Sequence, residues 1–163
     1  MHDKNTTTPT NIGVKPNVGR GNKKVKIDPF IEWEIKIEKG NQFFADNDFG
    51  EAKEEYLCAK ELAHQIFESM VSPDSAVPAL VVSYHNVADL YKKERNFNQA
   101  YQELDEINSY LVSCLEKVGK NSKRSNAIRR GIDMTHAELL SFIQKNKIEI
   151  AYGNVINLSL IHI

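Results

Sequence analysis

His85 and Asp89 are the side chains whose types and spacing best suit chemistry, because they lie four residues apart in a stretch of helical periodicity. At that spacing an imidazole and a carboxylate share one helical face, where they can hydrogen-bond or reach one metal ion. Two ligands do not complete a metal site, and His64 and His136 are too remote in sequence to be placed beside them. No HExxH motif and no paired CxxC motif occurs. We therefore predict no catalytic residue and no metal, and keep a small metal-dependent enzyme using His85 and Asp89 as one alternative.

Glycines and cysteines offer no stronger site. Gly13, Gly19 and Gly21 lack the preceding strand and following helix that a phosphate-binding loop requires. Cys58 and Cys114 fall within amphipathic helical patterns, without a basic or histidine neighbour at helical spacing that would clearly activate a thiolate. We expect both to be reduced core residues, with a disulfide between them as the alternative, and we predict no cofactor.

The composition is that of one globular domain. Of the 163 residues, 41% are hydrophobic and 26% are charged, close to the averages for globular proteins. The longest apolar run is too short to span a bilayer, and the first residues lack the apolar stretch of a secretory signal. We expect a cytoplasmic protein without a membrane segment.

Residues 1–27 differ in composition from the rest of the chain. They are rich in Thr, Asn, Gly, Lys and Pro and contain no aromatic residue, so we predict a disordered basic leader. Residues 1–28 carry six basic and two acidic side chains, whereas the remainder carries 15 basic and 20 acidic ones. Nucleic-acid binding through the leader is thus an alternative function. The short length and the lack of aromatic residues do not favour it.

Helical periodicity fills residues 28–147 and predicts one all-helical domain of about five helices. Capping residues and turn residues mark the helix ends. The first expected helix begins at Asp28-Pro29, and the second runs from Asp48 to about Met70. The third spans about Val77 to Glu94, the fourth runs from Asn96 to a cap at Gly119, and the fifth spans about Ser122 to Lys145. Pro78 fits the third helix only in its first turn. Gly131 weakens the middle of the fifth by about 1 kcal/mol relative to alanine.

The end of the chain is treated separately. Residues 148–157 form an uncertain tail. Residues 158–163 resemble the in-frame translation of an adaptor that transposase-based sequencing libraries attach to DNA fragments, so we exclude them from the fold. The alternative for these six residues is a short apolar strand.

The first two helices and the next two align with identical internal spacings, at an offset of 48 residues. The aligned positions are Gly40, Phe43, Phe49, Ala52, Tyr56 and Ala59 with Ala88, Tyr91, Phe97, Ala100, Leu104 and Ile107. Small residues at Gly40, Ala52, Ala88 and Ala100 suit close helix crossings. The pattern resembles the tetratricopeptide repeat family. It departs from the family at Ile107, where the family prefers a small residue. It also departs in its offset of 48 residues, because the family's repeats are usually about 34 residues apart.

The resemblance implies antiparallel helical hairpins, with the fifth helix capping the open apolar face. It further implies an adaptor-like or chaperone-like module, and no enzyme, that binds a protein or peptide partner in a groove lined by the first helix of each hairpin. The family's groove positions fall on Glu34, Ile37, Asn41, Phe44 and Ala45 and on Val82, His85, Asn86, Asp89, Lys92 and Lys93. Ile37 stands where some members use a lysine to clamp a terminal carboxylate, so no clamp of that type is expected.

Overall fold

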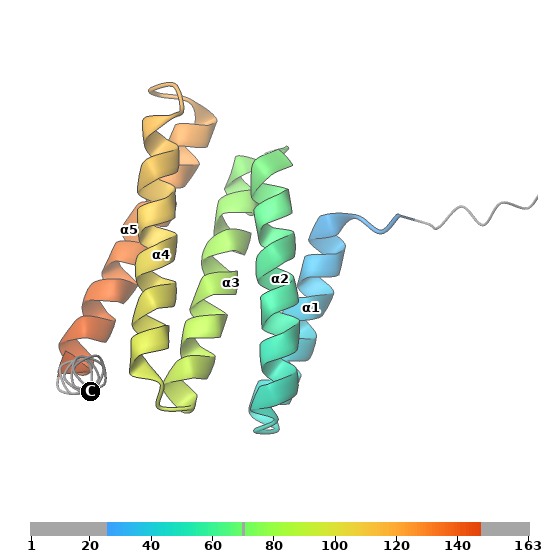
Figure 1. The fold of residues 1–163 in the computed structure, drawn as a ribbon. Coiled ribbons are helices and arrows are strands. Elements are labelled where there is room, and N and C mark those ends of the chain that lie inside the picture. Colours follow the sequence, from blue (N-terminus) through green and yellow to red (C-terminus); the bar gives the residue numbers. More distant parts are fainter. Residues whose placement is uncertain (1–25, 70, 148–163) are drawn as a thin grey trace, which may run out of the picture.

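The computed structural model describes residues 26–69 and 71–147 and contains only helices within these ranges (Figure 1). The helices are α1 (Pro29–Ala45), α2 (Phe49–Ser69), α3 (Pro73–Lys93), α4 (Phe97–Glu116) and α5 (Lys123–Lys145). The predicted all-α class is therefore confirmed. The predictions made for most of the leader, for residues 148–157 and for residues 158–163 lie outside the described residues.

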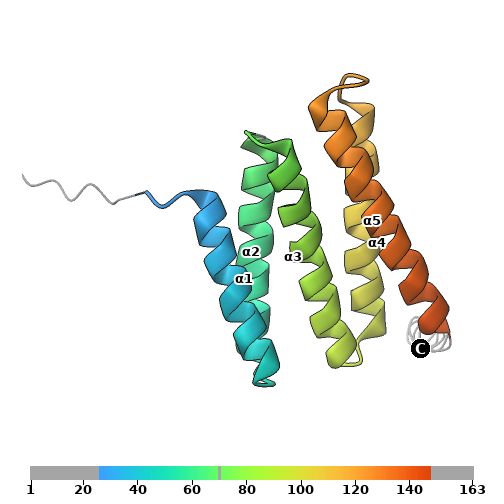
Figure 2. The same ribbon diagram turned by 180° about the vertical axis from the view of Figure 1, so that it is seen from behind.

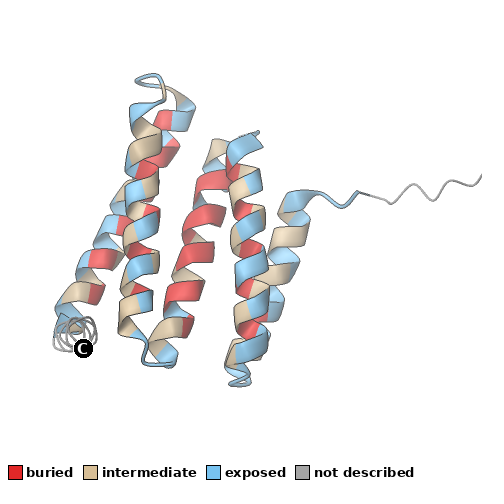
Figure 3. Ribbon diagram, viewed as in Figure 1, coloured by how far each residue is buried: buried red, intermediate tan, exposed pale blue. Residues whose placement is uncertain are grey.

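Two antiparallel hairpins, α1–α2 and α3–α4, stand side by side, and α5 packs against α3 and α4 (Figures 1 and 2). Helices α1, α3 and α5 lie on one side of the array, and α2 and α4 lie on the other. The central helix α3 buries more residues than any other helix of the described chain (Figure 3). No helix of the described part of the chain is long and apolar enough to cross a membrane.

The offset of 48 residues reappears in the backbone of the two hairpin turns. Asn47 and Arg95 both adopt a left-handed conformation, with φ of 61° and 57°. The next residue in each turn, Asp48 or Asn96, donates its backbone N–H to the carbonyl of Phe43 (2.9 Å) or Tyr91 (2.8 Å). Bonds of this kind satisfy carbonyl groups at the end of a helix. Both copies of the repeat therefore turn in the same way.

Small residues lie where the helices cross, as predicted. Ala52, Ala88 and Ala100 are fully buried, and a Cβ atom on Gly40 would lie 2.4 Å from the Tyr56 ring. Gly131 serves the same purpose in α5, because its Cβ would lie 2.5 Å from Val77 Cγ1. The weak point expected in the fifth helix is thus a point of close approach to α3.

Two predicted helix ends are wrong. Helix α3 begins at Pro73 rather than Val77, and Pro78 lies beyond its first turn. Proline at the first helical position loses no hydrogen bond, and the exposed Pro78 removes only one. Gly119 does not cap α4. The helix ends at Glu116, and Lys117 donates its N–H to carbonyls of the last turn.

The prediction that both cysteines belong to the core is wrong for Cys58, which is exposed. It lies on the outer face of α2, away from the buried stripe of Ala52, Tyr56 and Ala59. Cys114 is half-buried against the core, and both described cysteines are free.

Candidate functional site

Helix α3 leaves one stripe of its surface accessible, and this stripe holds the groove residues that the sequence predicted for the third helix; the other predicted groove residues lie on α1. Its members recur every three or four residues, as one face of a helix requires. They are Pro78, Val82, His85, Asn86, Asp89, Lys92 and Lys93, all exposed or half-buried. The stripe lies on the side of the array shared by α1, α3 and α5 (Figure 2).

Phe44 lies beside the C-terminal part of this stripe. Together with Asp89, Lys92 and Lys93 it lines an open depression of about 340 Å³. Its ring packs against Phe49, with 5.7 Å between ring centroids, and Lys93 Nζ lies 5.9 Å from the centroid of Phe44. Phe44 therefore belongs both to the hairpin packing and to the accessible face.

Asn41 has a structural contact that sequence reasoning missed. The Tyr56 hydroxyl donates a hydrogen bond of 2.8 Å to Asn41 Oδ1. Burial, and to a smaller degree the Asp89 carboxylate, raise the pKa of Tyr56, so the phenol keeps the proton that it donates. The oxygen of Asn41 thus holds the first hairpin together, while its side-chain NH₂ group is still free to meet a ligand.

Helix α5 adds a residue to the site that was not predicted. Lys92 Nζ lies 3.5 Å from Glu138 of α5 and also pairs with Asp89. Sequence spacing could not place Glu138, because its contact with Lys92 depends on how α5 crosses α3. Toward the N-terminal end of α3, Pro78 lines a hollow of about 100 Å³ with Arg130 and Met134 of α5.

His85 lies on the accessible stripe with its ring largely buried. Burial and the Lys92 cation lower the pKa of His85, whereas the Glu138 and Asp89 carboxylates oppose that shift. Nε2 is itself buried and has no hydrogen-bond partner among the described residues. Those residues contain no group of three His, Cys, Asp or Glu side chains that could hold a metal ion.

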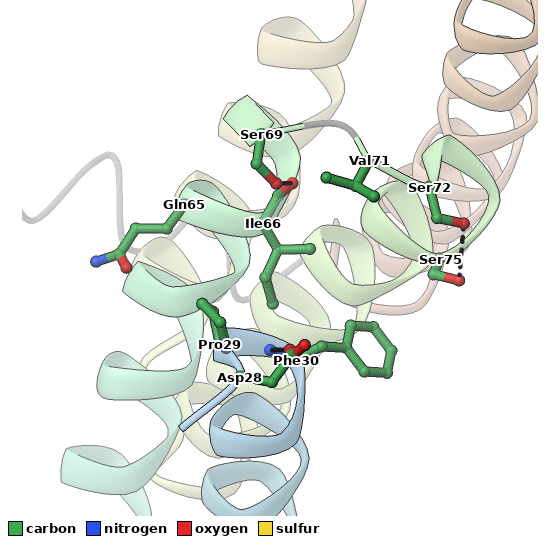
Figure 4. A pocket seen from close by; sticks show the side chains of 9 residues that line it. All are labelled: Asp28, Pro29, Phe30, Gln65, Ile66, Ser69, Val71, Ser72 and Ser75. Atoms are coloured by element: carbon green, nitrogen blue, oxygen red, sulfur yellow. Dashed lines mark hydrogen bonds between the residues drawn. The ribbon is translucent and has the colours of Figure 1, made fainter. Parts of the chain in front are cut away.

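A second hollow of about 350 Å³ lies at the start of α1, away from the predicted groove (Figure 4). Figure 4 shows the Ile66 side chain reaching from α2 toward the start of α1. The lining residues are Asp28, Pro29, Phe30, Gln65, Ile66, Ser69, Val71, Ser72 and Ser75. Because the hollow forms where the ends of three helices meet, no local sequence signal could have indicated it.

A polar network on the other side of α3 was also missed. The buried Tyr84 hydroxyl donates to Glu106 of α4 at 2.9 Å, so His64 Nε2, also 2.9 Å away, must donate to Tyr84. Lys60 Nζ lies 3.9 Å above the Tyr84 ring and donates to Glu103 at 2.6 Å. Burial raises the pKa of Tyr84 and lowers that of His64. The network joins α2, α3 and α4, and we assign it to structure.

These elements define a small all-α protein of antiparallel helical hairpins, with an accessible stripe on its central helix. Residues 31–156 match the family described as protein of unknown function (DUF2753), and the chain belongs to that family. No curated protein and no solved structure matches it.

Proposed function

We propose that this chain is a tetratricopeptide-like interaction module that binds an extended segment of a partner protein along the accessible stripe of α3. The supporting observation is that α3 is the most buried helix of the described chain yet keeps one continuous stripe open between α1 and α5. Depressions at Phe44 and at Pro78 lie along that stripe. The module acts in the cytoplasm as an adaptor or a chaperone-like protein.

The stripe offers the kinds of group that an extended peptide needs. Phe44 and Val82 supply accessible apolar surface for a side-chain anchor. The Asn86 amide, which makes no hydrogen bond within the described residues, can both donate to and accept from a peptide backbone. Lys93 is exposed and forms no salt bridge in the same part of the chain, so it can meet an acidic group of the partner. None of these roles requires a metal, a cofactor or a catalytic residue.

Selection from a random peptide library, followed by calorimetry on synthetic copies of the selected peptides, tests this function. An Asn86→Ala, Lys93→Ala variant removes two stripe side chains that support no other described contact, apart from the distant approach of Lys93 to Phe44. We expect it to bind the peptides at least about tenfold more weakly, equivalent to about 1.4 kcal/mol.

A Lys39→Ala, Gln102→Ala variant is the matched control, because it also removes one lysine and one side-chain amide, from exposed positions off the stripe. It should bind like the wild type. Equal weakening by both variants, or peptides that bind the Asn86→Ala, Lys93→Ala variant as well as the wild type, would place binding elsewhere. Failure to select any peptide would contradict the function itself.

A further inference from the structure

Charge is segregated along the helical body. Residues 28–69, which include the α1–α2 hairpin, carry eleven acidic and four basic side chains, a net charge of −7. Residues 117–147, from the end of α4 through α5, carry eight basic and two acidic side chains, a net charge of +6. The two regions occupy opposite ends of the array (Figure 1). A chain with a net charge of −1 thus presents two strongly charged surfaces of opposite sign.

The acidic face, as we define it, consists of Glu51, Glu54, Glu61 and Glu68 on the outer face of α2. All four are exposed, and their spacings of three and seven residues keep them on one side of the helix. Within residues 26–69 and 71–147 none of them forms a salt bridge.

The two lysines of α2 do not neutralise the acidic face, because both turn away from it. Lys53 Nζ lies 4.7 Å from the centroid of the Tyr91 ring of α3. Lys60 Nζ lies 2.6 Å from Glu103 of α4. The four carboxylates therefore have no paired lysine on their own helix.

The basic end consists of Lys117, Lys120, Lys123, Arg124 and Arg129, at the end of α4, in the connection and in the first turns of α5. All five are exposed, and none forms a salt bridge with another described residue. The neighbouring Arg130 is excluded because it pairs with Asp74.

Each charged surface also has an accessible apolar side chain near it. Leu57, between Glu54 and Glu61 in sequence, is 42% exposed, and Val112, in the last turns of α4, is 41% exposed. Stable contacts commonly combine a small apolar centre with a charged surround. Charge alone is strongly weakened by salt, so these side chains matter for a contact at physiological ionic strength.

We propose that the basic end of one copy binds the acidic face of α2 on a second copy. The two surfaces are different patches, so the contact is heterologous and leaves a free patch on each copy, which allows further copies to add. Neither patch includes the accessible stripe of α3, so this contact is independent of the proposed partner binding. A polyanion such as nucleic acid also suits the basic end but offers nothing to the acidic face.

Sedimentation velocity of the full chain over a range of concentrations, at low salt and at about 0.5 M salt, tests the contact. The wild type should associate as concentration rises and dissociate in high salt. A Glu54→Gln, Glu61→Gln variant and a Lys120→Gln, Lys123→Gln variant each lose one patch. Each alone should associate at least tenfold more weakly.

An equimolar mixture of the two variants retains one intact pair of patches, and it should form a 1:1 dimer that does not grow further. Controls with the same change in net charge are Glu34→Gln, Glu38→Gln on α1 and Lys145→Gln, Lys147→Gln at the end of the described chain. Both controls should associate like the wild type, and circular dichroism should show every variant equally helical.

A wild type that is monomeric at every concentration in low salt would overturn the proposal. So would variants that associate like the wild type, or a mixture that stays monomeric. If the wild type is monomeric and retains a nucleic-acid oligomer that the Lys120→Gln, Lys123→Gln variant loses, the basic end binds polyanions instead.

Discussion

The indole nitrogen of Trp33 donates a hydrogen bond of 2.8 Å to the hydroxyl oxygen of Ser83, joining α1 to α3 across 50 residues of sequence. The Ser83 hydroxyl in turn donates to the Ala79 carbonyl of its own helix, also at 2.8 Å. Ser83 is fully buried, so its hydroxyl has no water as a ready substitute. The bond therefore helps to fix how the first hairpin sits against the central helix.

Replacing Ser83 by alanine should leave the Trp33 N–H without a partner in a partly buried site. We expect a loss of about 1–3 kcal/mol in the free energy of unfolding, measured by urea denaturation. Trp33→Phe and the double variant complete a mutant cycle. The double variant should cost about 1 kcal/mol less than the sum of the two single changes, whereas additive costs would mean that the bond contributes nothing.

Gly131→Ala should destabilise the fold although alanine favours a helix. The added Cβ would lie 2.5 Å from Val77 Cγ1 and 3.1 Å from Leu111 Cδ1, so α5 must move away from α3 and α4. Overpacking of this kind costs about 1–3 kcal/mol. Gly50→Ala in α2 is the control, because the nearest atom to its Cβ is 3.9 Å away. It should be neutral or stabilising by less than about 1 kcal/mol. Equal effects of the two changes in a urea melt would show that α5 does not approach closely at Gly131.

The fold should become less stable as the pH is lowered, because of His64. Burial, and then the Lys60 cation, hold the pKa of His64 below its ordinary value of 6.5, while Glu106 and Glu68 oppose this. The unfolded chain binds a proton at a pH where the folded chain does not. The stabilising contribution is therefore complete above about pH 6.5 and is lost as the pH falls toward the folded-state pKa.

Urea melts between about pH 7.5 and 5 measure the slope of the free energy of unfolding against pH. His64→Gln should flatten it without abolishing it, because the pKa of His85 is lowered as well. His136→Gln, at an exposed position of α5, is the control substitution of the same type. If the His64→Gln variant shows the same pH dependence as the wild type, other groups cause that dependence.

Removal of residues 1–27 should leave the thermal midpoint within a few degrees of that of the full chain. The leader has too few apolar residues to join the core, and Ile27 is 53% exposed. A chain that begins at Ile31 is the comparison, because it also lacks the Asp28 cap and the Phe30 side chain packed on the core. Its midpoint should fall by several degrees. A large fall on removing residues 1–27 alone would mean that the leader packs on the body.

The sequence by itself determined the helices, their pairing into hairpins and the face of α3 that stays accessible. Helical periodicity, the capping oxygens of Asp28 and Asn96 and the small residues at Gly40 and Ala52 act over a few residues along the chain. Local rules of this range can be read from one sequence. The stripe from Val82 to Lys93 was predictable for the same reason, since one face of a helix repeats every three or four residues.

Only the tertiary structure decided which side chains meet across helices. The contact of Glu138 with Lys92, the approach of α5 to α3 at Gly131 and the hydrogen bond from Tyr56 to Asn41 all depend on how two helices cross. Crossing angles are set by the fit of side-chain ridges into grooves over the whole contact, not by the spacing of residues along one helix. For that reason the groove positions could be predicted, while the contacts of Asn41 with Tyr56 and of Lys92 with Glu138 could not.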